Sequence, residues 1–149
     1  MDMSIHLTTA HCPSTATDFT HMRDIPYCEA IGSLMYAALG TWPNIAFAVQ
    51  TISCFSMKPG PAHWEAVKWV FCYSKGTIEL LSFRMKKMKL TRYTDTDGSM
   101  SEDRHTISGY AFLIHGNAVS WSAKWQEIIT LLTTEAEYVT ITHATKKAL

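Results

Sequence analysis

The sequence predicts an α+β chain, in which a short helical bundle is followed by an antiparallel β-meander and one final helix. Up to about Thr77, apolar residues recur with a helical period and are separated by Gly and Pro breaks. After Thr77 the period becomes two, as in strands, and it turns helical again from Thr133. With 149 residues and 47% hydrophobic content, the chain is long enough for one ordinary domain or two partial ones.

Three helices are expected in the first part, and Gly or Pro marks their ends. Apolar residues between Ile31 and Leu39 follow the i, i+3, i+4, i+7 pattern, and Gly40 ends that helix. The second helix begins near Pro43. The third has Pro61 in its first turn, where a missing N–H costs nothing, and ends near Gly76. The polar segment 1–24 is expected to be irregular.

The second part is expected to form three or four strands and a helix. Alternating or apolar runs predict strands at 78–83, 90–95, 108–115 and 118–123. A lysine-rich turn at 85–89 separates the first two strands, and Gly116-Asn117 predicts a turn between the last two. Thr133 or Thr134 is expected to cap the final helix.

Composition excludes some classes of protein. Thirteen basic residues balance thirteen acidic ones, which gives no general electrostatic argument for nucleic-acid binding. The four cysteines form no C-x-x-C pair and no secretory leader precedes them, so we expect free thiols in a protein that is intracellular and not secreted, in cytoplasm or nucleus. No run approaches the roughly 18 apolar residues of a membrane span.

The residues with most chemical promise are carboxylates. Asp95 ends a strand-like run, and Glu137 lies in the first turns of the final helix; Asp97 and Glu135 are the alternates. Hard oxygen ligands from a strand and from a helix packed over it can converge on Mg²⁺, where a pair of cations supports phosphodiester cleavage. The same residues also fit ordinary turn chemistry around Asp95 and an ordinary capping box at Thr134 and Glu137.

Several segments together resemble one family. Segment 27–36 is similar to Y-R-x-x-I-G-S-L-M-Y, 59–66 to P-x-x-x-H-W-x-A, and 73–77 to Y-L-K-G-T. Segment 93–99 is similar to Y-(S/T)-D-A-D-G/W-S/A, segments 108–110 and 119–122 to S-G-Y and S-W-S, and 133–138 to S/T-x-E-A-E-Y. In order and spacing, the chain resembles the Pol polyprotein of copia-type retrotransposons over nearly its full length.

The resemblance implies a function for each part. Residues 25–77 would be the helical tail of a reverse transcriptase, and 78–149 the front half of a ribonuclease H-like domain, an incomplete fold. In the family this domain cleaves RNA in RNA–DNA hybrids with Mg²⁺, and Asp95 and Glu137 align with its first two metal ligands. The family's remaining ligands lie further downstream, in the missing remainder of the Pol polyprotein. We therefore expect an inactive remnant that binds magnesium and nucleic acid weakly.

The departures from the family pattern are all of one mutational type. Seven positions where the family typically carries arginine hold other residues: Cys28, Trp42, Cys54, Trp69, Cys72, His105 and Trp125. Thr96, Thr140 and Thr145 replace alanine, Asn44 replaces aspartate and Lys147 replaces glutamate. Each change is one C→T or G→A step, so we hypothesise a decayed genomic copy. Alignment with intact copies tests this, because a balanced mix of transitions and transversions contradicts it.

Two alternatives stay open. The chain could be a nucleic-acid- or protein-binding module co-opted from the element, in which Asp95 is incidental. It could also be the first part of an active ribonuclease H in a gene model that is cut short. A strand resembling L-x-C-D-N within the next thirty or so codons would favour the enzyme.

Overall fold

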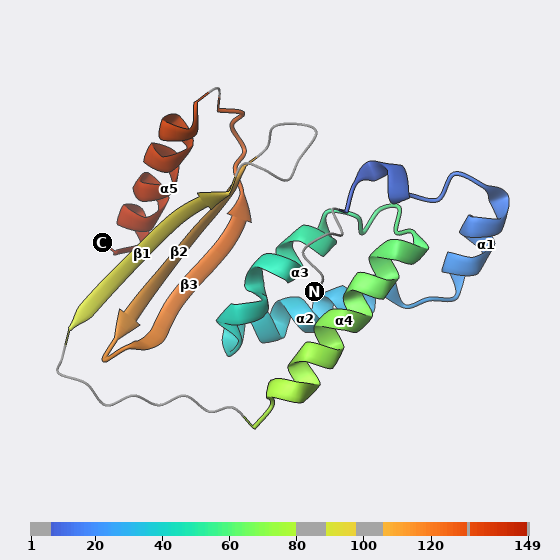
Figure 1. Cartoon of the computed structure of the whole chain (residues 1–149), viewed down its shortest axis with the longest axis horizontal. Helices are drawn as coiled ribbons and strands as arrows, with labels where there is room; N and C mark the ends of the chain where they lie inside the picture. The colour runs from blue at the N-terminus through green and yellow to red at the C-terminus, as the bar shows by residue number, and fades with distance from the viewer. Residues whose placement is uncertain (1–6, 80–88, 98–105, 131, 149) are drawn as a thin grey trace. The chain divides into compact units, whose positions relative to one another are not determined.

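The computed structural model of the chain describes residues 7–79, 89–97, 106–130 and 132–148 (Figure 1). It is an α+β protein with five α-helices and a three-stranded antiparallel sheet within those ranges. The chain divides into two compact units, Met1–Leu80 and Leu81–Leu149. The assignment of these parts to a reverse transcriptase tail and a ribonuclease H-like domain stays a prediction.

The first unit is a small helical bundle. Its elements are η1 (Thr9–His11), α1 (Ala16–Arg23), α2 (Tyr27–Gly40), η2 (Pro43–Ile45), α3 (Ala46–Ser53) and α4 (Pro61–Thr77). The buried faces of α2, α3 and α4 form one apolar core. Within it, the Tyr27 hydroxyl donates a hydrogen bond to the Ile52 carbonyl at 2.8 Å, which ties the start of α2 to α3. The three expected helices are therefore present, each close to its expected bounds.

The start of α4 is held by a buried histidine and by a close backbone approach. His63 is fully buried, and its Nδ1 accepts the Gly60 N–H at 2.9 Å, which satisfies a donor ahead of the helix. A Cβ at Gly60 would lie 1.9 Å from the His11 carbonyl oxygen, so only glycine allows η1 to sit against this end of α4. His63 is thus a packing residue.

One expectation for the first unit is wrong. Segment 1–24 was expected to be irregular, but it contains η1 and α1. The reason is a capping box: the Thr15 hydroxyl accepts the Asp18 N–H, and the Asp18 carboxylate accepts the Thr15 N–H. These two residues start a helix that has almost no apolar period, and a search for periodicity overlooks such a helix.

The second unit is a meander covered by a helix. Strands β1 (Leu90–Asp97), β2 (Ile107–Ile114) and β3 (Asn117–Trp125) pair in the order β1-β2-β3, and α5 (Thr133–Ala148) packs against β1 and β2 (Figure 1). Asp95 pairs with Gly109, and Thr96 with Ser108. These strands lie where the sequence predicts them, and so does the final helix, but its expected cap is wrong. Thr133 and Thr134 are already helical, and the helix is preceded by Leu132, whose carbonyl accepts the N–H groups of Glu135 and Ala136.

Two further expectations differ from the structure or fall outside it. The β2–β3 turn is His115-Gly116, both at positive φ (56° and 83°), one residue earlier than expected; such a left-handed pair suits a two-residue hairpin. Ile78 and Glu79 form a turn after α4 and not the start of a strand. The remainder of the expected strand at 78–83, with most of the lysine-rich turn, lies outside the described residues.

Candidate functional site

Asp95 and Asp97 lie near the end of β1 and share one face of the sheet, because side chains alternate along a strand. Asp95 is exposed, and its Oδ1 accepts the N–H of Thr96 at 2.8 Å. Asp97 is half-buried at the last position of β1, opposite Ile107. Both carboxylates are thus held by a regular strand.

Glu135 and Glu137 lie in the first turns of α5, and both are exposed. The face of α5 that is buried consists of Ala136, Thr140 and Ala144, spaced four residues apart. Glu137 follows Ala136 and therefore lies about 100° around the helix from this buried face. Both glutamates therefore lie on the helix that the sequence predicts, one on each side of its buried face.

β1 and α5 meet through hydroxyl groups. The Thr96 Oγ1 lies 2.7 Å from the Thr140 Oγ1, and it also reaches the Ala136 carbonyl oxygen at 3.5 Å. Thr96 therefore points towards α5. Since neighbouring residues of a strand point to opposite faces, Asp95 and Asp97 leave β1 on the face that α5 does not cover.

A buried polar network lies behind this contact. The Ser108 and Thr140 hydroxyls are 2.7 Å apart, and Thr140 donates to the Ala136 carbonyl at 3.0 Å. The Gln126 amide donates from Nε2 to the Ser108 hydroxyl at 2.8 Å and to the Ala136 carbonyl at 3.0 Å. Gln126 and Thr140 are almost fully buried, so these bonds are made away from water.

This network was not predicted from the sequence. A usable signal was present, because Thr96 and Ser108 lie on strand positions that face the helix, where a core would normally place apolar side chains. Polar side chains at such positions need buried partners. The Ala136–Thr140 stripe of α5 supplies one of them.

The carboxylates suit Mg²⁺ by donor type but do not fit the expected pair of cations by position. Hard oxygen ligands are the correct chemistry. However, Asp95 points away from the sheet face that α5 covers, and Glu137 belongs to α5. Among the described residues, no group of three or more His, Cys, Asp or Glu side chains is gathered closely enough to hold a metal. We therefore derive no catalytic step through a metal ion, and Asp95 and Glu137 as metal ligands stay a prediction.

Comparison with known proteins gives the family. The chain is 42% identical over 97% of its length to the retrovirus-related Pol polyprotein from transposon TNT 1-94 of Nicotiana tabacum, and 31% identical over 93% of its length to that from transposon RE2 of Arabidopsis thaliana. The chain belongs to the copia-type retrotransposon Pol polyproteins. It spans 11% and 9% of the length of these two Pol polyproteins, about a tenth of each.

One relative of this Pol-derived chain matches it over nearly the whole length of that relative. Secreted RxLR effector protein 161 of Plasmopara viticola is 39% identical over 86% of the chain, and the match covers 92% of that protein. No family model and no solved structure matches the chain. No helix within the described ranges combines the length and the apolar character needed to cross a bilayer.

Proposed function

We propose that this Pol-derived chain carries the front part of a ribonuclease H-like domain in its second unit, behind the helical tail of a reverse transcriptase. The observation that supports this most directly is the packing of α5 on β1 through Thr96 and Thr140. It joins the strand that carries Asp95 to the helix that carries Glu137, in the order that the resemblance implies. Its ancestral substrate is then an RNA–DNA hybrid, its ancestral cofactor Mg²⁺, its natural partner the rest of the Pol polyprotein, and its location intracellular, in cytoplasm or nucleus.

On the same grounds, the 149-residue chain is not expected to cleave RNA–DNA hybrids by itself. Two-cation cleavage needs carboxylates that converge on metals about 3.5–4 Å apart. Asp95 and Glu137 are instead carried on opposite sides of the contact between β1 and α5, which supports weak binding of single magnesium ions at most.

Incubation of the full chain with an end-labelled RNA–DNA hybrid in magnesium tests this. We expect no product above the blank. Product that appears with the chain and disappears in Asp95→Asn, but not in the matched surface control Asp24→Asn, would overturn the proposed inactivity. It would favour an active ribonuclease H.

A second candidate is a stand-alone binding module derived from the element. The Plasmopara viticola relative favours it, since that protein has nearly the same extent as this chain. A module of this kind must fold unaided. A cooperative urea unfolding curve for the purified chain supports it, and a gradual, non-cooperative curve rules it out.

A further inference from the structure

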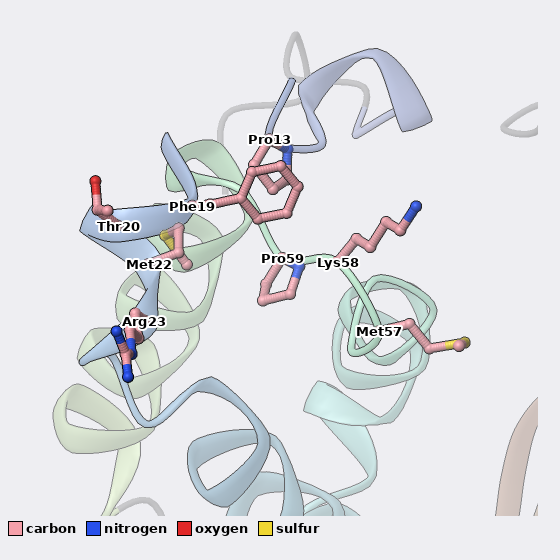
Figure 2. Close-up of a pocket in the computed structure, with 8 residues that line it drawn as sticks. All are labelled: Pro13, Phe19, Thr20, Met22, Arg23, Met57, Lys58 and Pro59. Atoms are coloured by element: carbon pink, nitrogen blue, oxygen red, sulfur yellow. The ribbon is translucent and has the colours of Figure 1, made fainter. Parts of the chain in front are cut away.

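An open cleft of about 430 Å³ lies in the first unit, between α1 and the segment that leads into α4. Its volume is within the range of small-molecule sites. Figure 2 shows the side chains that line it, coming from both walls. The lining residues are Pro13, Phe19, Thr20, Met22, Arg23, Met57, Lys58 and Pro59.

The cleft has an apolar floor with an accessible ring. Phe19 is 51% exposed although it is a large apolar side chain on a helix, and its ring extends towards Pro13 and Pro59 (Figure 2). Met22 is buried beneath it. A half-exposed aromatic ring in the wall of a cleft can stack with a planar ligand.

The charge around the cleft has one sign. Arg23 comes from α1 and Lys58 from the opposite wall, and none of the described residues that line the cleft is acidic. Within the described ranges, neither cation belongs to an ion pair; the two ion pairs found there use Lys68 and Lys124. The nearby Asp18 carboxylate is occupied by Thr15, whose hydroxyl bond lowers the pKa of Asp18. The site therefore favours an anion.

We propose that this cleft binds single-stranded nucleic acid, with one base on the Phe19 ring and neighbouring phosphates on Arg23 and Lys58. An aromatic platform between cations binds bases without reading their edges. Thr20 is the only other polar side chain in the lining, so no array of hydrogen-bonding groups selects a base.

A peptide fits the cleft less well. Its walls are a helix and a loop, so there is no free strand edge on which an extended peptide could add a strand. The site also differs from that of the proposed ribonuclease H function. It lies in the other unit and uses no carboxylate and no metal, so either proposal can fail without the other.

Fluorescence anisotropy of a short labelled oligothymidine, titrated with the full chain in low salt and a metal chelator, tests the proposal. Arg23→Glu/Lys58→Glu removes both proposed phosphate contacts. Its matched control, Lys75→Glu/Lys146→Glu, makes the same change in net charge at exposed residues that do not line the cleft. We expect at least a tenfold larger loss of affinity in the cleft variant. The slope of log K against log salt should also be shallower by about 1.4, because each phosphate contact on a single strand contributes about 0.7.

Phe19→Ala separates stacking from charge. We expect it to weaken binding roughly 5- to 100-fold with the salt slope unchanged, since stacking of a base on an aromatic ring does not release counterions. An abasic oligonucleotide should bind the parent chain as weakly as the normal oligonucleotide binds Phe19→Ala. Equal losses in the cleft and control charge variants, or equal binding of the abasic strand, would overturn the proposal. Urea midpoints close to that of the parent confirm that the variants are folded.

Discussion

At the scale of single residues, Thr140 joins α5 to two strands of the sheet. The residue is 1% exposed, and its hydroxyl contacts the Thr96 hydroxyl of β1, the Ser108 hydroxyl of β2 and the Ala136 carbonyl. The resemblance implies alanine at positions 96 and 140, so two replacements predicted from the family pattern meet each other directly. The buried hydroxyls satisfy one another, and the interface tolerates them for that reason.

Thr140→Val keeps the shape of the side chain and removes its hydroxyl. We expect the free energy of unfolding to fall by about 1–3 kcal/mol, because the Thr96 and Ser108 hydroxyls lose a buried partner. Thr142→Val on the exposed face of the same helix is the control, with an expected change within about 0.5 kcal/mol. Urea unfolding measures both. Similar losses in the two variants would show that the network contributes nothing.

The coupling between the two threonines can be measured separately. In a double-mutant cycle of Thr96→Ala and Thr140→Ala, the double variant should be more stable than the sum of the single changes predicts, by about 0.5–3 kcal/mol, because alanine at both positions leaves no unpaired hydroxyl. Additive changes would contradict a direct interaction.

His63 makes the first unit sensitive to acid. The ring is fully buried and stacked on Phe55 with centroids 4.0 Å apart, and His11 lies edge-on at 6.2 Å. Burial lowers the pKa of His63, and the nearby His11 lowers it further. The unfolded chain then takes up a proton at higher pH than the folded one. Stability is therefore complete above about pH 6.5 and falls as the pH drops below that value.

We expect the free energy of unfolding to decrease between pH 7 and pH 5.5 by at most about 1.4 kcal/mol per pH unit from this residue. His63→Asn keeps an acceptor for the Gly60 N–H and removes the titration, so its stability should vary less with pH. His143→Asn, at an exposed position, should behave as the parent does. Parallel pH profiles for the parent and His63→Asn would exclude His63 as the cause.

At the scale of elements, α5 shows how tertiary contacts override local preference. The run 139–142 is β-branched, and such residues are poorer helix formers than alanine. The helix is nevertheless continuous from Thr133 to Ala148. Thr142 and Thr145 each donate to the carbonyl four residues earlier, at 2.8 Å, so their hydroxyls are satisfied within the helix.

Thr142→Ala and Thr145→Ala should therefore stabilise α5, by up to about 0.7 kcal/mol each, because these exposed threonines contribute helix propensity and little packing. Thr140→Ala should destabilise the protein despite the same gain in propensity. Thermal melts followed by circular dichroism at the helical band measure these changes. A uniform stabilisation by all three would mean that α5 does not pack on the sheet as described.

The elements that the sequence predicted were those with a clear apolar period and a Gly or Pro boundary. Both criteria are met by α2, α3 and α4, while β2 and β3 have the alternating or apolar runs of strands. The α1 helix was missed because Thr15 and Asp18, and not a stripe, define it. The hairpin was displaced by one residue because His115 takes the left-handed conformation that we expected of Asn117.

The candidate site was predictable only in part, for a geometric reason. Motif and period placed Asp95 on a strand and Glu137 on a helix. They did not reveal that Thr96, and not Asp95, faces that helix. Such a relation depends on which side of the meander α5 covers, and this side is determined by contacts between residues some forty positions apart in the chain.

At the scale of the whole molecule, the two units differ in what holds them together. The first has a contiguous apolar core drawn from α2, α3 and α4. Among the described residues of the second unit, few large apolar side chains are buried, Ile107 and Phe112 among them, beside its polar network. Polar contacts contribute less net stability than apolar burial of similar extent.

We therefore expect two urea transitions, with the second unit unfolding first. The tryptophans report both, since Trp42, Trp64 and Trp69 belong to the first unit and Trp121 and Trp125 to the second. Trp121→Phe/Trp125→Phe should remove the fluorescence change of the earlier transition only. A single transition that the tryptophans of both units report together would show that the units unfold as one.

Three of the cysteines have a practical consequence for anyone who handles the protein. Cys28, Cys54 and Cys72 are exposed, and the resemblance implies arginine at each of these positions. Where relatives would present guanidinium groups to solvent, this surface presents thiols. Storage under oxidising conditions should therefore cross-link monomers into multimers through disulfides, and a reductant should reverse this. The aggregation of the protein should then depend on redox conditions more than on ionic strength.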